Sequence, residues 1–488
     1  MESTTHFHEL TDVLHENAPS EEHAATEMTF AVSASFIAVG CGPALAWNCI
    51  WVSVAFFQEK LGDGVLAELG FATNSCVLIG MLLYAALRTR WPAARLPVLG
   101  ALLYQGALCT ALPLWVYFRG DNGIAPAMIL SAAALNGLVM GLSHGAVSDT
   151  AGLFPGSRAN TLGMVGTGIA TLIPTLVQLA ITLSAGASVA AQMAARRSAI
   201  YVVFPGAVIG IVSAAVAWIA ITRVPLFVHA AAAKRARYAL APRCTERCAR
   251  PAQYAYGAGS DARACAGVEA AAEDGEDQPV GVGVEDAQHN PLAGLRINVQ
   301  RAGSTAVCPL HYAGPVGMRV AFHLTVLFLT AVVSTVVLAV SPRVPPVDKT
   351  SAWWELNMSS LIANEYNVLC FAGTVAASSE RLQRAARRYH AVIVLALLRV
   401  GFIIPVALYL HFGVSYYPLP LYAVAALTSG FVLVTESAHC QNICGASPRT
   451  VHLCSYVAML TWTTTQGGIV VGNAVGIGYT LIYGDAPR

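Results

Sequence analysis

Charge is scarce in this sequence. Asp, Glu, Lys and Arg make up 11% of its 488 residues, whereas soluble domains average about 25% charged residues. The formal net charge is only +1, so the chain has no strong overall field that would attract nucleic acid. Residues Met1–Glu27 contain no Lys or Arg and lack the basic region that opens a cleaved signal peptide. We expect the first apolar segment to be retained as a signal anchor.

The motifs of several enzyme classes are also missing. No glycine-rich phosphate loop followed by Lys occurs, which argues against an ATP-driven pump. No close-spaced set of His, Asp and Glu offers the metal or nucleophile that a membrane enzyme needs. Cys244 and Cys248 form a single Cys-x-x-x-Cys with no second close pair, which is a weak zinc signal. The sequence therefore predicts no enzyme, no metal and no cofactor.

Long apolar segments are what the chain has instead. Hydrophobic residues make up 56% of it, and a bilayer core needs about 20 apolar residues per helix. Eleven segments, split six and five by a polar stretch, are 30–57, 66–88, 97–118, 123–147, 159–185, 199–222, 318–341, 358–379, 389–412, 417–438 and 453–483. They predict an all-α polytopic membrane protein with eleven transmembrane helices.

The polar stretch and the basic residues predict the domain organisation. Cytoplasmic loops accumulate Lys and Arg, and the basic loop at Arg384–Arg388 favours a cytoplasmic amino terminus. We expect a cytoplasmic tail over 1–29, a six-helix bundle over 30–231, a cytoplasmic disordered loop over 232–317 and a five-helix bundle over 318–488. The carboxyl terminus is then expected outside. The loop combines a basic run with an acidic stretch rich in Gly and Ala, a composition typical of disorder.

Ionisable residues within the apolar segments are few. Arg399 lies in the ninth segment, and an ion inside a membrane is costly unless it is paired or hydrated. It is either part of a functional site or a structural charge, paired with another ion or bonded to backbone carbonyls near Pro405. Glu436 must be paired, protonated or hydrated, and Arg399 is a candidate partner. Asp149 ends the fourth segment, and we expect it at the cytoplasmic interface.

Two aromatic side chains are further candidates for substrate contacts. Trp47 follows Gly40, Gly42 and Pro43, a composition that loosens helix packing and frees backbone groups to face a cavity. The alternative for Trp47 is a lipid or interface contact. His144 has small neighbours that leave room beside its ring, and an imidazole both donates and accepts hydrogen bonds. The alternative for His144 is a hydrogen bond within the bundle.

Several stretches resemble the equilibrative nucleoside transporters. Gly40–Asn48 is similar to the family's glycine-containing lead into Pro-Trp-Asn, with alanine in place of the proline. Ala151–Pro155 resembles Ala-Gly-Leu-(Leu/Phe)-Pro, and Gly166–Ala170 resembles Gly-Gln-Gly-Leu-Ala. Leu398–Phe402 is similar to the family's Arg-containing segment, and Glu436–Ser437 stands where an Asn-Gly pair is usual. The six-plus-five arrangement agrees with this resemblance.

The resemblance implies a fold and a site. The implied fold is major-facilitator-like, with two helix bundles around a cavity near the bilayer midplane that opens to each side in turn. By position, Trp47 would line the nucleobase, and His144 would occupy a polar position that contacts the substrate. The family's eighth helix carries an Asp followed four residues later by an Arg, whereas Cys370 and Thr374 stand there in this chain. The resemblance therefore does not imply the family's full recognition of ribose for this chain.

The sequence thus predicts a facilitative transporter of nucleosides, with purine nucleosides such as adenosine and inosine as the first expectation. The alternatives are a nucleobase carrier, a proton-coupled carrier or a different small-solute carrier of the major-facilitator type. We expect a multi-pass plasma-membrane protein whose partners are its substrate and the lipid bilayer, with no nucleic acid. The sequence does not give its oligomeric state. The candidate substrate-binding residues are Trp47, His144, Asn367, Cys370, Thr374, Arg399 and Glu436.

Overall fold

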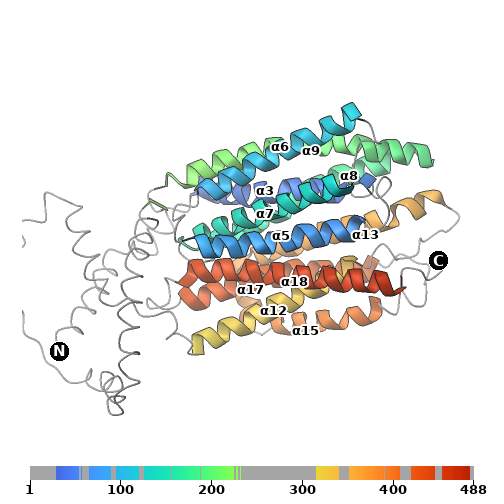
Figure 1. The fold of residues 1–488 in the computed structure, drawn as a ribbon. Coiled ribbons are helices and arrows are strands. Elements are labelled where there is room, and N and C mark those ends of the chain that lie inside the picture. The colour runs from blue at the N-terminus through green and yellow to red at the C-terminus, as the bar shows by residue number, and fades with distance from the viewer. Residues whose placement is uncertain are drawn as a thin grey trace, which may run out of the picture. The chain divides into compact units, whose positions relative to one another are not determined.

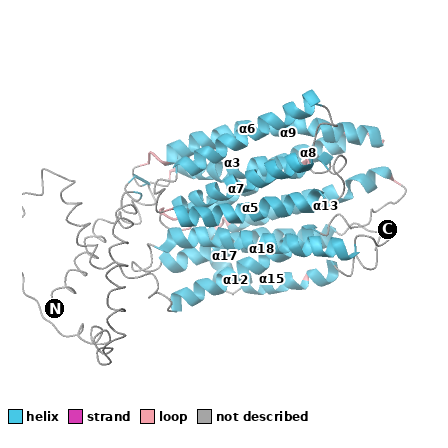
Figure 2. Ribbon diagram, in the orientation of Figure 1, coloured by secondary structure: helices cyan, strands magenta, loops and turns pink. Residues whose placement is uncertain are grey.

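The computed structural model describes residues 29–53, 56–57, 65–88, 95–119, 126–154, 157–186, 188–224, 227–228, 231, 315–339, 351–388, 391–406, 419–445 and 453–483. Every regular element in these ranges is helical (Figure 2), which confirms the all-α prediction. Residues 1–28 and 232–314, which hold most of the expected tail and loop, lie outside them. Helices suit these apolar segments because each satisfies its own backbone hydrogen bonds where no water is present.

Six long helices form the N-terminal half. They are α3 (Phe30–Val52), α5 (Val65–Leu87), α6 (Arg95–Arg119), α7 (Pro126–Ala151), α8 (Arg158–Ser184) and α9 (Val189–Ile221). The C-terminal half contains α12 (Pro315–Ala339), α13 (Ala352–Ala377), α14 (Glu380–Arg388), α15 (Ala391–Gly401), α17 (Leu419–Gly445) and α18 (Cys454–Tyr483). The long helices run alongside one another, and α5, α7, α8 and α9 of the first half contact α13, α17 and α18 of the second (Figure 1).

Eight described helices are long and apolar enough to cross a membrane: α3, α5, α6, α7, α8, α9, α12 and α17. With 26 and 30 residues, α13 and α18 have the length but are less apolar, because they carry polar side chains such as Asn364 and Gln466. The apolar stretch Ala391–Val406 is too short. The predicted count of eleven transmembrane helices is therefore not confirmed, and eight are found in the described residues.

The ninth predicted segment, 389–412, is interrupted. In the structure α15 ends at Gly401, and the helix is broken by a turn at Phe402 before it resumes. Pro405 explains the break, because it has no N–H to donate to the carbonyl of Gly401 four residues earlier. The break lies three residues beyond Arg399. It places that ion beside a helix end, as one of the two sequence interpretations expected.

Glycines allow the closest helix contacts. A Cβ atom on Gly166 of α8 would lie 2.0 Å from the carbonyl oxygen of Ile37 on α3, and one on Gly141 of α7 would lie 2.1 Å from that of Val77 on α5. Neither site has room for a larger residue. Membrane helices associate through such backbone approaches, because lipid provides no hydrophobic drive for helix association.

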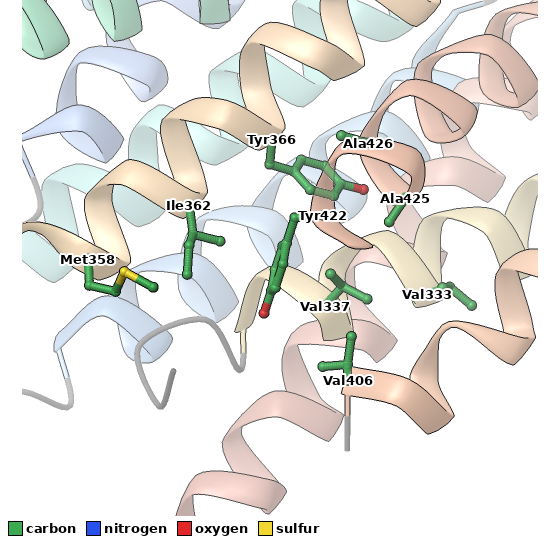
Figure 3. Packing of buried hydrophobic residues seen from close by; sticks show 9 residues of the cluster. All are labelled: Val333, Val337, Met358, Ile362, Tyr366, Val406, Tyr422, Ala425 and Ala426. Atoms are coloured by element: carbon green, nitrogen blue, oxygen red, sulfur yellow. The ribbon is translucent and has the colours of Figure 1, made fainter. Parts of the chain in front are cut away.

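The C-terminal half has its own apolar core. Tyr366 of α13 and Tyr422 of α17 lie next to each other there, with Val333 and Val337 of α12 on one side (Figure 3). Val406, just beyond the break in the α15 segment, packs against the same group. This core joins α12, α13 and α17, and it leaves one side of α13 and α18 free to meet the N-terminal half.

Candidate functional site

Amide side chains join the two halves toward the predicted outer side of the membrane. Asn364 of α13 donates from Nδ2 to Oε1 of Gln178 on α8 over 3.2 Å. Asn357, two turns earlier on α13, donates to Oε1 of Gln192 on α9 over 3.2 Å. All four residues are buried. Buried amides are stable only when hydrogen bonded, so these pairs hold α13 against α8 and α9 without any charge.

A tryptophan of the C-terminal half contacts two polar side chains of the N-terminal half. Trp462 of α18 donates from Nε1 to Oδ1 of Asn160 on α8 over 3.2 Å. Asn160 in turn donates from Nδ2 to the hydroxyl of Ser437 on α17 over 3.1 Å. The ring of His144 on α7 lies against the indole of Trp462, with centroids 5.0 Å apart and planes inclined by 49°. Two helices from each half therefore meet at one polar and aromatic cluster.

A small cavity adjoins this cluster. Its walls are formed by Gly40, His144, Val147, Ser148, Ala151, Asn160, Gly163, Thr167 and Trp462. The space is about 10 Å³, which is roughly the minimum for a single water molecule. The halves are therefore closed on each other here, and a larger solute enters only when they separate. Two glycines in the wall leave the backbones of α3 and α8 bare.

Buried polar atoms without partners mark the same region. Nε2 of His144 has no hydrogen-bond partner in the described part of the chain, and neither does either amide atom of Asn136, which is fully buried. Asn136, Met140 and His144 follow at four-residue intervals and share one face of α7. Met140 belongs to the apolar cluster against which Trp47 and Trp462 pack. Unsatisfied buried groups are rare, and a polar ligand or water at this face would satisfy them.

The structure brings together two of the seven predicted site residues. The ring of His144 lies against that of Trp462, and Trp47 packs against the same Met140 cluster as Trp462. Asn367 reaches the other half, where its Nδ2 donates to the hydroxyl of Thr175 over 3.4 Å. It does not line the cavity described above.

Cys370 and Thr374 do not line the cavity either. The hydroxyl of Thr374 donates over 3.1 Å to the carbonyl of Cys370 on its own helix. Cys370 packs against the C-terminal core formed around Tyr366 and Tyr422. These positions of α13 therefore pack within the C-terminal half in this conformation, and their contact with a substrate stays a prediction.

Arg399 is fully buried and lies within the C-terminal half. Its Nη1 donates to the carbonyl of Ala425 and, over 2.7 Å, to the hydroxyl of Thr428, both on α17. Its Nη2 donates over 2.6 Å to the hydroxyl of Ser334 on α12. Among the described residues it has no carboxylate partner. Arg399 therefore connects three helices of one half, which matches the structural interpretation of this charge.

The candidate pairing of Glu436 with Arg399 is wrong. Oε2 of Glu436 lies 2.5 Å from Nδ1 of His323 on α12. The guanidinium of Arg399 instead donates hydrogen bonds to Ala425 and Thr428, which lie two to three helical turns before Glu436 on α17. Sequence reasoning missed His323, because a histidine near the start of an apolar helix gives no signal of its partner.

Asp149 is not at the interface with water. α7 continues to Ala151, and Asp149 is only 2% exposed. The hydroxyl of Tyr84 on α5 donates to Oδ2 of Asp149 over 2.8 Å, and the hydroxyl of Ser455 on α18 donates to the other oxygen. The bond from Tyr84 lies within the N-terminal half, and the bond from Ser455 joins the two halves at the predicted cytoplasmic end of α5 and α7.

Sequence reasoning also missed Trp462 and Asn160. One signal was available: the run from Thr461 to Gln466 is polar within an otherwise apolar helix. Polar residues in a membrane helix face protein or water, so this stretch of α18 marks an internal surface. Gln466 confirms that orientation, because its Nε2 donates over 2.8 Å to Oδ1 of Asn74 on α5.

No protein-family model matches the chain, and no curated protein matches its sequence significantly. Three solved structures are similar to it. One is the major facilitator superfamily proton:xylose symporter XylE bound to 6-bromo-6-deoxy-D-glucose, with 14% identity, coverage of 94% of this chain and 89% of that chain, and a TM-score of 0.49. The second is the xylose transporter XylE from E. coli in a partially occluded inward-open conformation, with 14% identity, coverage of 94% and 100%, and a TM-score of 0.39. The third is tetrameric PepTSo2, with 11% identity, coverage of 93% and 98%, and a TM-score of 0.36. At these identities and scores the neighbours give this chain no substrate.

Proposed function

We propose that the protein is a membrane carrier that moves a small polar solute by alternating access. The observation that carries this proposal is the small space beside Trp462 of the C-terminal half, where His144 and Asn160 of the N-terminal half offer polar atoms. Carriers bind their solute at the interface of two bundles and expose it to one side at a time. The unpartnered Nε2 of His144 supports a polar ligand at this place.

Bonds between the halves on both sides of the cavity support a moving carrier. Asn357 and Gln192 connect the halves toward the predicted outer side, and Asp149 and Ser455 connect them toward the predicted cytoplasmic side. Breaking one set while keeping the other opens the cavity to one side only. The orientation, with amino terminus and central loop in the cytoplasm and carboxyl terminus outside, and the plasma membrane as location are part of this proposal.

The finer proposal is a nucleoside or nucleobase substrate. Aromatic rings prefer offset or tilted contacts with other flat rings; Trp462 lines the cavity, and Trp47 packs against the same apolar cluster as Trp462. His144 and Asn160 supply donors and acceptors for a heterocycle. With Cys370 and Thr374 turned to the C-terminal half, the contacts proposed for the substrate favour its base over its ribose.

Uptake into proteoliposomes tests this proposal. Radiolabelled adenosine, inosine, hypoxanthine and uridine are offered to the full chain, to His144→Ala and to Ser213→Ala, whose hydroxyl lies on the exposed side of α9. Saturable uptake that His144→Ala weakens and Ser213→Ala preserves is the expected result. Uptake of hypoxanthine alone would narrow the substrate to nucleobases. Uptake of none of the four would overturn the purine proposal, and sugars and short peptides would then be tried.

A further inference from the structure

A histidine and a glutamate form a close contact inside the C-terminal half. Nδ1 of His323 on α12 lies 2.5 Å from Oε2 of Glu436 on α17. A neutral imidazole can donate from Nδ1 to this carboxylate oxygen. Glu436 is 2% exposed, whereas the side chain of His323 keeps 13% of its exposure. The histidine is therefore the less buried member of the pair.

A second histidine borders this pair. The rings of His323 and His439 are perpendicular, with centroids 4.4 Å apart. His439 lies three residues after Glu436 on α17 and shares its face of the helix. Imidazoles are the side chains that most readily gain and lose protons near neutral pH. Two imidazoles and a carboxylate at one place inside a membrane protein are the residue types of proton relays.

Other charged groups on the surrounding elements are distant or solvated. Arg319 on α12, Arg158 on α8 and the described arginines of α14, Arg381 and Arg384, are exposed. Cys440 lies about one turn after Glu436 on α17. Cys454 and Tyr456 lie on α18, and Glu365 lies near the middle of α13. Arg399 on α15 contacts α17 at Thr428, about 12 Å further along the helix axis.

The pair is directly connected to the contact between the halves. Ser437 follows Glu436 and accepts a hydrogen bond from Asn160 of α8, and its hydroxyl lies 3.0 Å from that of Thr461 on α18. Asn160 also holds the indole of Trp462 beside the cavity. A change of charge at Glu436 therefore acts one residue away from a hydrogen bond that closes the two halves.

We propose that His323 and Glu436 form a proton-binding site that couples solute movement to a proton gradient. The inference rests on the proposed carrier function and assigns its energy source. A proton from water adds to the neutral imidazole of His323 and makes an imidazolium beside the Glu436 carboxylate, so that the pair has no net charge. Loss of that proton to the other side restores a neutral imidazole and leaves one net negative charge. Because an uncompensated buried charge is costly, the unloaded pair favours a conformation that admits water.

Proton-driven uptake tests the site in the reconstituted full chain. Proteoliposomes with a neutral interior receive radiolabelled adenosine and hypoxanthine with and without acid outside, and one pH unit supports up to about tenfold accumulation for one proton per solute. Glu436→Gln keeps a polar group beside His323, so we expect the acid-driven accumulation to vanish while exchange of internal for external solute continues. The exposed Glu68→Gln should behave as the parent does. Equal uptake by the parent with and without acid, or acid-driven uptake by Glu436→Gln, overturns the proposal.

An infrared measurement separates this inference from the choice of substrate. Difference spectra of the purified protein are recorded between mildly acidic and mildly alkaline buffer with no solute present. We expect histidine-ring and carboxylate bands that disappear in His323→Gln and Glu436→Gln. Exposed carboxylates stay ionised over this range, so Glu68→Gln should leave the spectrum unchanged. If neither solute is transported, bands lost in both variants still support the proton site, whereas bands unaffected by either variant refute it.

Discussion

In the N-terminal half, α5 and α7 approach so closely that a Cβ atom on Gly80 would lie 2.2 Å from the carbonyl oxygen of Leu138. In the C-terminal half, α13 and α17 do the same, since a Cβ atom on Gly373 would lie 2.0 Å from the carbonyl oxygen of Leu427. Both halves therefore contain helices whose bare backbones are in contact. Under the proposed alternating access, this packing would let each half move as a rigid body.

The two halves differ in the polar groups that they bury. The cavity-facing groups of the N-terminal half, such as His144 and Asn160, are neutral hydrogen-bonding side chains at the contact with the other half. The C-terminal half encloses Arg399 and the His323–Glu436 pair among its own helices. Buried ions are costly and persist when they are fully bonded or functional. Apart from Asp149 of α7, the comparison assigns solute contact mainly to the N-terminal half and buried charge to the C-terminal half.

The largest effect is expected from removing the buried arginine. Arg399→Leu leaves the hydroxyls of Ser334 and Thr428 and the carbonyl of Ala425 without their donor, and buried groups left unsatisfied cost about 1–3 kcal/mol each. We expect a loss of about 3 kcal/mol or more in stability, measured as thermal unfolding in detergent. Arg158→Leu on the exposed start of α8 is the control. Equal melting temperatures of the two variants would show that the stability of the C-terminal half does not depend on the charge of Arg399.

Enlarging a contact glycine should affect both halves alike. Gly141→Val in α7 and Gly430→Val in α17 each place a side chain where a Cβ atom would lie within about 2 Å of a backbone oxygen, and overpacking costs about 1–3 kcal/mol. Gly206→Val is the control, since nothing lies within 4 Å of its Cβ position. Thermal unfolding gives the measurement. A large loss at only one of the two sites would break the similarity between the halves.

Asp149→Asn should loosen the contact at the predicted cytoplasmic end. The carboxylate accepts from Tyr84 and Ser455, and hydrogen bonds to charged groups contribute about 1.5–3 kcal/mol. We expect a thiol reagent to reach an introduced Ser148→Cys in the cavity wall several-fold faster in this variant, as measured by mass spectrometry. Glu68→Gln in the same Ser148→Cys background is the control. Unchanged labelling would mean that other contacts close this end.

The smallest effect is expected at the indole. Trp462→Phe keeps an aromatic ring beside His144 but loses the hydrogen bond to Asn160, which contributes about 1 kcal/mol. We expect the solute concentration that gives half-maximal uptake to rise roughly fivefold, with protein abundance in the membrane unchanged. Trp462→Leu, which also removes the ring, should weaken uptake further. Equal uptake by the two variants would remove Trp462 from the site.

Apolar length was sufficient to locate the helices, because a membrane segment has few alternatives to a helix. The break in α15 could also be anticipated from Pro405. The hydrogen-bond partners of the buried ions could not be anticipated from the sequence. Whether Glu436 meets Arg399 or His323 depends on how α12, α15 and α17 are placed around one another, and that placement follows from backbone contacts such as Gly430 with Cys370. Trp47 and His144 were predicted by resemblance; His144 contacts Trp462, Trp47 packs against the same apolar cluster as Trp462, and their contact with a substrate stays a prediction.

The amide pairs between the halves have an electrical consequence. Asn364 with Gln178 and Asn74 with Gln466 separate and re-form without moving any net charge. A membrane potential does about 2.3 kcal/mol of work per elementary charge for each 100 mV, and on these pairs it does none. Opening and closing at these contacts therefore proceeds at the same rate in polarised and depolarised membranes, and any voltage dependence of transport reports on the buried charged groups, such as Asp149, Arg399 and Glu436.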